Sequence, residues 1–389
     1  MRILVVSPFQ PHPAASHGGG VYLGQLLAAL EHQADVATVC FAYPDDPPAP
    51  ADIPSFRLPR LHRDQLGRGR VLLDQVRYAF QWGVLGLPLE AAKHRSGPFR
   101  RLLRRALDEF EPDVAMVEFS VMAQYLADLS SVRTVFTDHE QGESLPPRIG
   151  PGAVGRRRDR RLWRKYTRHY LPMADLCQAL TNEDAAQLEK LTGRPVAVRP
   201  PLIEIPGNAV SPEETDPVML FLGDYRHHPN PEAAEVIARD VLPAVRAEIP
   251  EAELWLAGPR AEGQVDSLAR YPGVRLLGYV ENLASLMSKV RCLVAPVFSG
   301  SGVRIKVLSA MAHGLPVVSN RLGMQGVPAP AQAFLSGETP AELAGACGVF
   351  LDNPARAASA GQSARSFIEK HMDPVSLVEQ QLERIRSIM

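Results

Sequence analysis

The segment 295–320 (APVFSGSGVRIKVLSAMAHGLPVVSN) concentrates the residues best suited to bind an anion. A short apolar run enters a loop of small residues, and a helix is expected to follow with Gly302 and Val303 in its first turn. Free backbone N–H groups at a helix N-terminus favour anions, and Arg304 and Lys306 add positive charge beside them. Such an assembly could stabilise the charge on a departing nucleoside diphosphate. A glycine-rich turn before a helix with solvated cations is the alternative.

A second glycine cluster, Gly18, Gly19 and Gly20, lies between the apolar run RILVVS and a helical pattern that begins at Val21. Glycines in such a loop could bring backbone N–H groups and a helix N-terminus close to a phosphate. The cluster is neither G-x-G-x-x-G nor a Walker A motif, so a flexible connection is the alternative. Its place after a first strand favours the site, because the first such loop of a doubly wound sheet opens at the ligand-binding edge.

Alternating strand and helix patterns run through the whole chain and predict an α/β fold. The predicted strands are 2–7, 34–42, 113–119, 133–139, 218–223, 253–259, 274–280, 292–298 and 315–320, and helices are predicted over 100–112, 231–249 and 303–314. Thr181 is expected to cap a helix that ends at Gly193.

The proline-rich stretch 199–217 is the best candidate for a linker between two domains. We therefore expect two doubly wound Rossmann-like domains over 1–199 and 200–373, and a C-terminal helix over 374–389 that packs back toward the first. Ligands of such sheets bind beyond the carboxyl ends of the strands, so the default site is the cleft between the domains.

The composition is that of an ordinary globular chain, because 46% of the 389 residues are hydrophobic and 22% are charged. This balance excludes general disorder. The 42 Lys and Arg residues and 43 Asp and Glu residues nearly cancel, which argues against a nucleic-acid binder. The four cysteines are too widely spaced to indicate a zinc site, and no apolar run could span a membrane. We expect a cytoplasmic protein.

Residues 219–326 resemble the C-terminal domain of the family-four retaining glycosyltransferases, which have the GT-B fold. The first half is similar as well, through its glycine-rich first loop and the segments RTVFTDHEQGE and ADLCQALTNEDAAQLEKL. The loop Gly-Ser-Gly-Val-Arg-Ile-Lys is similar to that of one subgroup of the family. The resemblance implies transfer of a sugar from a nucleotide-sugar to a hydroxyl acceptor, which could be a glycan, a lipid-linked sugar or a small molecule. It implies retention of anomeric configuration and no cofactor or dedicated metal site.

The resemblance also implies roles for individual residues. His139 would lie at the acceptor side, where an imidazole can accept a proton or bond to a sugar hydroxyl, and a structural histidine is the less favoured alternative. Lys306 would face the donor diphosphate. The other implied donor-binding residues are Gly18, Gly19, Gly20, Gly223, Arg226, Gly258, Tyr279, Val280, Ser299, Gly300, Ser301, Gly302, Val303, Arg304 and Ser309.

Two positions depart from the family pattern. Relatives usually carry two glutamates eight positions apart, and this chain has Ser301 and Ser309 there. Ser309 would replace the glutamate that holds the nucleotide ribose, and a serine cannot accept two charge-assisted hydrogen bonds, so weaker nucleotide binding is expected. Two rival functions therefore stay open: a non-catalytic auxiliary or binding protein, and a nucleotide-sugar 2-epimerase on the same fold.

Two basic stretches remain, 93–107 and 155–170. The second places Leu162, Trp163, Tyr166 and Tyr170 among arginines, so as a helix it could lie at an anionic membrane surface. The alternative, which we favour, is a solvated helix with Leu and Trp packed inward. An acceptor that bears phosphate could use the same charge.

Overall fold

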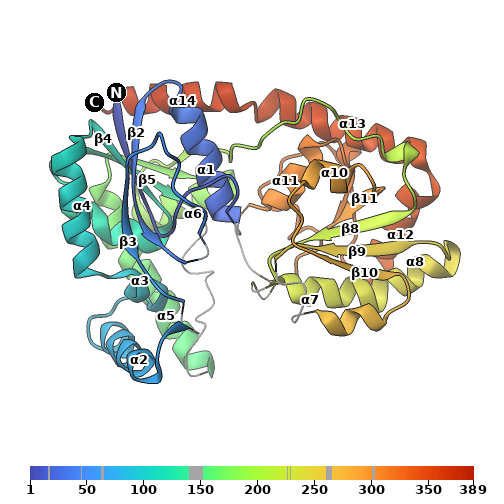
Figure 1. Cartoon of the computed structure of the whole chain (residues 1–389), viewed down its shortest axis with the longest axis horizontal. Helices are drawn as coiled ribbons and strands as arrows, with labels where there is room; N and C mark the ends of the chain where they lie inside the picture. Colours follow the sequence, from blue (N-terminus) through green and yellow to red (C-terminus); the bar gives the residue numbers. More distant parts are fainter. Residues whose placement is uncertain are drawn as a thin grey trace. The chain divides into compact units, whose positions relative to one another are not determined.

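The computed structural model describes residues 1–15, 18–44, 46–62, 65–139, 152–225, 227, 229–259, 265–299 and 303–389 (Figure 1). These residues form two compact units. The first contains Met1–Pro201 and Val375–Met389, and the second contains Leu202–Gly300 and Arg304–Pro374. Each unit holds one sheet whose described strand pairings are all parallel. The predicted fold class, two doubly wound Rossmann-like domains, is confirmed.

The first sheet has the strand order β3-β2-β1-β4-β5-β6-β7. Its strands are β1 (Arg2–Ser7), β2 (Asp35–Ala42), β3 (Ser55–Pro59), β4 (Val114–Glu118), β5 (Arg133–Asp138), β6 (Leu176–Ala179) and β7 (Ala197–Val198). Side chains on both faces of β1 are fully buried, as expected for the central strand of a parallel sheet. The order reverses between β1 and β4, and ligands of doubly wound sheets bind at such a switch point.

The helices of the first unit are α1 (Gly18–Leu30), α2 (Arg68–Gly83), α3 (Leu89–His94), α4 (Gly97–Phe110), the 3-10 helix η2 (Ser120–Asp128), α5 (Gly152–Tyr170), α6 (Asn182–Thr192) and α14 (Pro374–Arg386). Buried side chains of α3, α4, η2, α5 and α6 share one core cluster with Leu4 and Val6 of β1. The alternate residues Ile3 and Val5 point to the opposite face of the sheet.

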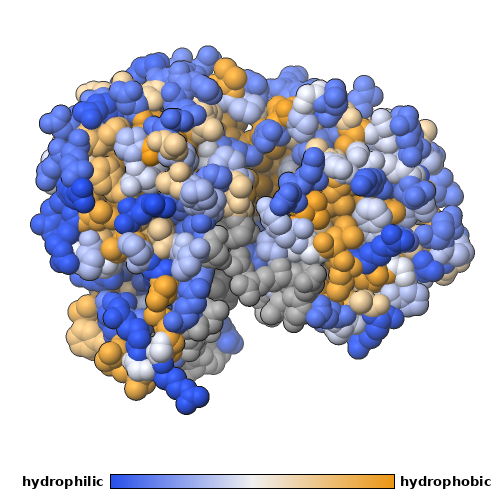
Figure 2. Space-filling model, in the orientation of Figure 1, coloured by the Kyte–Doolittle hydropathy of each residue, from blue (hydrophilic) through white to orange (hydrophobic). Residues whose placement is uncertain are grey.

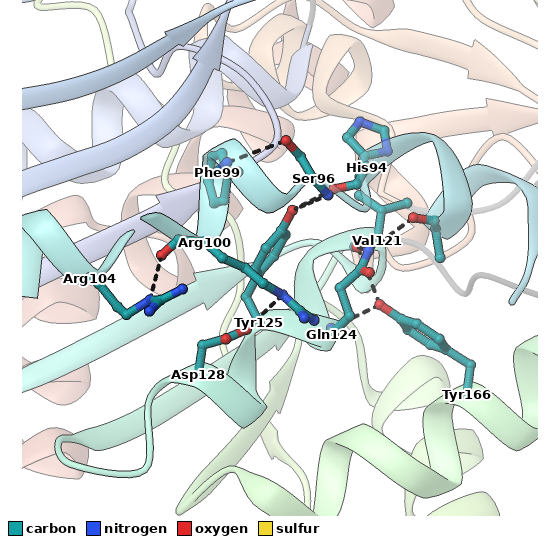
Figure 3. Close-up of polar contacts among 11 residues, drawn as sticks. His94, Ser96, Phe99, Arg100, Arg104, Val121, Gln124, Tyr125, Asp128 and Tyr166 are labelled. Carbon is teal, nitrogen blue, oxygen red and sulfur yellow. Dashed lines mark hydrogen bonds and ion pairs between the residues drawn. The ribbon is translucent and has the colours of Figure 1, made fainter. Parts of the chain in front are cut away.

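A buried polar network joins α3, α4, η2 and α5 (Figure 3). The hydroxyl of Tyr125 donates to the carbonyl of His94 over 2.6 Å and accepts from the Ser96 N–H over 3.2 Å. The hydroxyl of Tyr166 accepts from the Gln124 N–H over 2.9 Å and donates to the carbonyl of Val121. These bonds satisfy buried polar groups that would otherwise be costly, and they fix α5 against the core.

The predicted cap of α6 is confirmed. The Thr181 hydroxyl accepts from the N–H of Asp184 over 3.0 Å, and Gly193 ends the helix with φ of 70°. A left-handed residue at this position favours glycine.

The second sheet has the strand order β10-β9-β8-β11-β12-β13. Its strands are β8 (Val218–Leu222), β9 (Glu253–Ala257), β10 (Val274–Gly278), β11 (Cys292–Val294), β12 (Val317–Ser319) and β13 (Phe334–Ser336), and its α-helices are α7 (Pro229–Val236), α8 (Leu242–Glu248), α10 (Leu283–Met287), α11 (Ile305–Ala312), α12 (Pro340–Asp352) and α13 (Pro354–His371). Between α7 and α8 the chain forms one π-helical turn, Ile237–Val241, just before Pro243. A proline lacks the N–H of a regular helical bond, so this irregularity divides the helix that was predicted as continuous.

The predicted linker contains a short 3-10 turn, Pro212–Glu214, and otherwise no helix or strand. In the part of the chain that the structure describes, no helix is both long and apolar enough to cross a membrane.

Candidate functional site

The strongest charge cluster of the first unit lies where β4 and β5 end. The two strands pair with Glu118 opposite Thr137, and His139 follows β5 by one residue. This register brings the His139 Nε2 atom to 2.5 Å from Glu118 Oε2, and both side chains are buried. The carboxyl edge of the sheet therefore holds an imidazole that is fixed by a carboxylate.

Arg199 neutralises the buried carboxylate. Its Nη2 donates to Glu118 Oε2 over 2.7 Å, and both side chains are almost inaccessible to water. Burial alone would raise the pKa of Glu118, but Arg199 and the hydrogen bond from His139 outweigh it and lower that pKa. Glu118 is therefore ionised at neutral pH.

His139 is neutral at this site. Burial is the largest cause that lowers its pKa, and the nearby charge of Arg199 acts in the same direction, while Glu118 opposes them. Because the ionised Glu118 can only accept, the proton of the neutral ring is on Nε2, and Nδ1 keeps its lone pair. Nδ1 is thus the atom that could accept a proton or a hydrogen bond from a substrate hydroxyl.

Aromatic rings hold the imidazole in place. The ring of Phe119 stacks on His139 with centroids 3.8 Å apart, and Tyr22 of α1 meets it edge-on at 5.1 Å. Phe119 has a φ of 74°, which is strained for an aromatic residue. Strain of this kind persists where the surroundings fix a functional side chain.

The three glycines near the N-terminus form the first turn of α1 rather than the loop that was predicted. A Cβ atom on Gly19 would lie 2.8 Å from the rings of both Phe119 and Phe9, so this turn packs directly on the aromatic pair. Glycine here lets the positive end of the α1 dipole approach the stack that holds His139. The structure thus brings Gly19 and His139 together.

A chain of polar contacts leads from this site to α14. The Thr137 hydroxyl donates to Glu118 Oε1 over 3.3 Å, and the neighbouring Gln178 of β6 donates to Gln381 Oε1 over 2.8 Å. Arg384 of α14 also donates to the carbonyl of Val198. The C-terminal helix is therefore part of the first unit and supports the strands behind Glu118.

In the second unit, Lys306 lies at the carboxyl edge of the sheet. Its Nζ donates to Asn230 Oδ1 over 2.8 Å and lies 4.1 Å from the ring centre of Phe221 on β8. Burial and, to a smaller extent, the charge of Arg304 lower the pKa of Lys306 to about 7. Both causes disfavour the charged form, so this amine is suited to gain a full charge when an anion arrives.

Gly223 and Gly258 pack tightly beside this amine. A Cβ on Gly223 would lie 2.7 Å from Asn230 Cγ, and one on Gly258 would lie 2.0 Å from the carbonyl oxygen of Gly223. Gly258 also has φ of 133°, and its N–H donates to the carbonyl of Gly278 over 2.7 Å. These two glycines bring the ends of β8 and β9 close together and allow the Asn230 side chain to pack on the Gly223 backbone.

The segment after β11 is held by Asn320, whose side chain accepts from the N–H of Val297 and donates to its carbonyl. Ser299 donates to Glu232 of α7 over 2.8 Å. The helix that was predicted to begin around Gly302 begins at Ile305, with Arg304 at its N-cap position. Val303 therefore precedes the helix, and Lys306 lies in its first turn.

The remaining predicted residues are less constrained. Tyr279 is 58% exposed and Val280 is half-buried after β10, while Ser309 is half-buried on α11 and its carbonyl accepts from the ring of His313. Arg226, Gly300, Ser301 and Gly302 lie outside the described residues. In the described ranges, no group of three His, Cys, Asp or Glu side chains could hold a metal ion.

The basic segment 155–170 lies within α5, and its apolar side faces inward. Trp163 is 1% exposed and Tyr166 is 4% exposed, so these rings belong to the core. The inward packing of Trp163 that the favoured interpretation expected is confirmed, and Leu162 is half-buried. The arginines Arg156, Arg157, Arg160 and Arg161 are exposed.

Three important residues were not predicted: Glu118, Arg199 and Asn230. In the sequence, Glu118 marks only a strand end and Arg199 only the start of the linker. An isolated charged residue carries no signal of burial until its partner is known, and these two partners are 81 positions apart. Asn230 had no signal beyond its proximity to a strand end.

Both halves of the chain match family models. Residues 16–205 match "Glycosyltransferase Family 4", and residues 216–353 match "Glycosyl transferases group 1". None of the curated proteins matches the sequence significantly.

Several solved structures have the same fold. Sucrose-phosphate synthase from Thermosynechococcus elongatus superposes with a TM-score of 0.73 at 18% identity, over 100% of this chain and 98% of that one. HepE from Anabaena, in complex with UDP and glucose, has a TM-score of 0.64 at 14% identity over 100% of both chains. An Escherichia coli trehalose-6-phosphate structure bound with UDP-2-fluoro glucose has a TM-score of 0.67 at 14% identity, again over 100% of both.

The fold and the two family matches define the class: this chain is a GT-B glycosyltransferase. Its first unit carries the family-four match and its second the group 1 match.

Proposed function

We propose that this protein transfers a sugar from a nucleoside diphosphate sugar to a hydroxyl group of an acceptor, with retention of anomeric configuration. The observation that carries the proposal is Lys306, a half-buried amine of lowered pKa beside Asn230, Gly223 and Gly258 at the carboxyl edge of the second sheet. Structural neighbours with UDP or a UDP-sugar bound support this choice of donor. A further neighbour, trehalose-6-phosphate synthase, is an enzyme of glycosyl transfer with retention.

In this proposal the second unit binds the donor. Lys306 becomes fully protonated against the diphosphate and stabilises the negative charge that develops as the bond between the anomeric carbon and the phosphate oxygen breaks. Arg304 adds a second cation, and the backbone around Gly223, Gly258, Tyr279 and Val280 contacts the nucleotide. The loop from Ser299 to Val303, with Arg226, completes the donor contacts.

In this proposal the first unit binds the hydroxyl groups of the sugar or the acceptor. His139 accepts a hydrogen bond from a sugar or acceptor hydroxyl at Nδ1, and Glu118 keeps the ring in the tautomer that makes this possible. Glu118 is thus a positioning residue. The helix N-terminus at Gly18, Gly19 and Gly20 offers a further set of N–H groups to the diphosphate. No metal takes part, and the four free buried cysteines suit a reducing cytoplasm.

Turnover of nucleotide-sugars with Lys306→Met tests the proposal. The variant keeps the length of the side chain and removes the charge, so it should fold while losing about 100-fold or more in kcat/KM. Lys289→Met changes an exposed lysine of the same unit and should leave kcat/KM unchanged. Proton NMR of the first-formed product should show the anomeric configuration of the donor. An inverted product, or equal rates for the two variants, would overturn the proposal.

A second candidate, a non-catalytic binding protein, rests on Ser309 of α11, the position where the family resemblance implies a glutamate. Ser309→Glu separates the two functions, because a carboxylate that accepts two ribose hydroxyls should tighten nucleotide binding about tenfold. Calorimetry with and without this substitution measures the gain. Donor hydrolysis by the unmodified protein would exclude the non-catalytic function, and its absence together with no turnover would favour it.

A further inference from the structure

Helix α2 carries its apolar side chains outward. Leu72, Leu73, Val76 and Phe80 are 62%, 68%, 61% and 54% exposed, and their spacing places them on one side of the helix. We call these four residues the apolar face of α2. Figure 2 shows hydrophobic residues in orange at the lower left of the molecule, where Figure 1 places α2. Single exposed leucines are common on proteins, but a continuous apolar stripe marks an interaction surface.

The opposite side of α2 faces the protein and is mixed, because Val71, Tyr78 and Trp82 are half-buried there beside the polar Asp74 and Gln81. Asp74 is only 18% exposed and pairs with Arg77 over 3.3 Å, and Gln81 is the buried residue of the helix. In an ordinary surface helix the apolar stripe faces the core, whereas the four residues of the apolar face of α2 are exposed. Rotating α2 would bury the apolar face, so its orientation must be imposed by other contacts.

Two contacts with α5 impose that orientation. Asp159 of α5 accepts from the indole N–H of Trp82 and from the N–H of Leu89, each over 2.9 Å. Arg158 lies 4.6 Å above the ring of Trp82 and donates to the carbonyl of Gly83 over 2.7 Å. The end of α2 is thereby fixed to α5, which is itself held to the core through Tyr166 (Figure 3).

The helix pair formed by α2 and α5 is strongly basic. Together α2 and α5 contain eleven Arg and Lys residues and two Asp residues, although the whole chain has a net charge of −1. Arg156, Arg157, Arg160 and Arg161 are exposed on α5, and Arg70 and Arg77 lie on α2 itself. Exposed leucine and phenylalanine flanked by arginines are the combination that peripheral helices present to an anionic bilayer.

We propose that α2 and α5 together dock this protein on the surface of an anionic membrane. The apolar face of α2 enters the boundary between headgroups and acyl chains, and the arginines of α5 and α2 bind headgroup phosphates. Trp163 and Tyr166 of α5, which the sequence suggested for this role, take no part because they are buried. A second copy of the chain fits this surface less well, because a symmetric contact would bring the two basic helices α5 together.

Vesicle co-sedimentation of the full chain tests the proposal without any need for catalytic activity. The protein should sediment with vesicles made of equal parts phosphatidylcholine and phosphatidylglycerol, and remain in solution with phosphatidylcholine alone. Leu73→Gln/Val76→Gln should weaken binding about tenfold because both side chains leave the bilayer. The matched control Val375→Gln/Met389→Gln changes two apolar residues that are 61% and 57% exposed elsewhere and should bind normally.

Two double substitutions of arginines test whether vesicle binding depends on the positive charge of α5. Arg157→Gln/Arg160→Gln should weaken binding by about tenfold or more, since each basic residue near an anionic surface contributes separately. Arg101→Gln/Arg104→Gln removes the same charge from exposed positions on α4 and should have little effect. The proposal is wrong if the unmodified protein ignores anionic vesicles, or if the apolar pair of substitutions leaves binding unchanged. It is also wrong if light scattering finds a dimer that Leu73→Gln/Val76→Gln dissociates, because a second copy then covers the surface.

Discussion

The imidazole of His139 and the carboxylate of Glu118 lie 2.5 Å apart at the carboxyl edge of the first sheet, where Glu118 ends β4 and His139 follows β5, and both side chains have almost no exposed surface. The pairing of β4 with β5 fixes this distance, and Arg199 supplies the charge that lets Glu118 remain ionised there. The tautomer of His139 therefore follows from a strand register and one distant arginine.

The ion pair between Glu118 and Arg199 should dominate the stability of the first unit. Glu118→Gln leaves a buried guanidinium without its partner, so we expect a loss of about 3 kcal/mol in the free energy of unfolding. Chemical denaturation measures it. Arg199→Met combined with Glu118→Gln should cost less than the two single substitutions added together. Glu109→Gln breaks an exposed pair with Arg105 and should change stability little. Equal effects of Glu118→Gln and Glu109→Gln would contradict this account.

The activity should persist into mildly acidic solution. Because burial lowers the pKa of His139 below 6.5, the ring stays neutral as the pH falls through that value, and activity should decline only below it. Glu118 raises that pKa, so Glu118→Gln should move the acidic limb of kcat/KM to still lower pH. A pH–rate profile of both proteins measures the shift. A limb that moves upward in Glu118→Gln would show that Glu118 does not act through His139.

Gly19 and Gly345 should respond to alanine in opposite directions. A methyl group at Gly19 meets the rings of Phe9 and Phe119 at 2.8 Å, so Gly19→Ala should destabilise the protein by about 1–3 kcal/mol. Gly345 lies within α12 with nothing within 4 Å of the added atom, so Gly345→Ala should stabilise it by about 0.5–1 kcal/mol. Thermal unfolding of the two variants compares them. Stabilisation by both would mean that α1 does not pack on the aromatic pair.

Nucleotide binding should take up protons. With its pKa lowered to about 7, Lys306 is partly neutral near pH 7, and an adjacent diphosphate would raise that pKa. Binding at pH 7 should therefore take up about half a proton, and affinity should fall as the pH rises above 7. Calorimetry in buffers of different ionisation enthalpy measures the uptake. Lys306→Arg stays charged, so its uptake should vanish; the same uptake in that variant would assign the proton to another group.

Much of the fold follows from the sequence, because continuous apolar runs such as RILVVS and LFLG can only be buried strands when helices alternate with them. The helix α6 was predicted with its cap, since Thr181 and Gly193 have local preferences that tertiary contacts do not change. Local patterns were less reliable at the site. Three glycines in a row favour a loop, but here helix α1 begins at Gly18 because packing on Phe9 and Phe119 outweighs the low helix propensity of glycine.

The buried ion pair between Glu118 and Arg199 could not be predicted, because the two residues are 81 positions apart in the chain. Nothing around Glu118 or Arg199 indicates that the two meet, and only the assembled sheet brings them together. The orientation of α2 is a similar case. Its apolar stripe would normally predict an inward face, and only the contacts of Trp82 with α5 show that the stripe points outward.

Ligand-induced thermal stabilisation tests the central claim most directly. The protein is heated with UDP, GDP, dTDP, ADP, CDP and their common sugars, because a ligand bound only by the native state raises Tm. We predict a clear rise with one nucleotide and its sugar, retained in Lys289→Met and lost in Lys306→Met. No rise with any nucleotide at millimolar concentration, or an equal rise in Lys306→Met, would contradict the claim that this amine holds the diphosphate of a sugar donor.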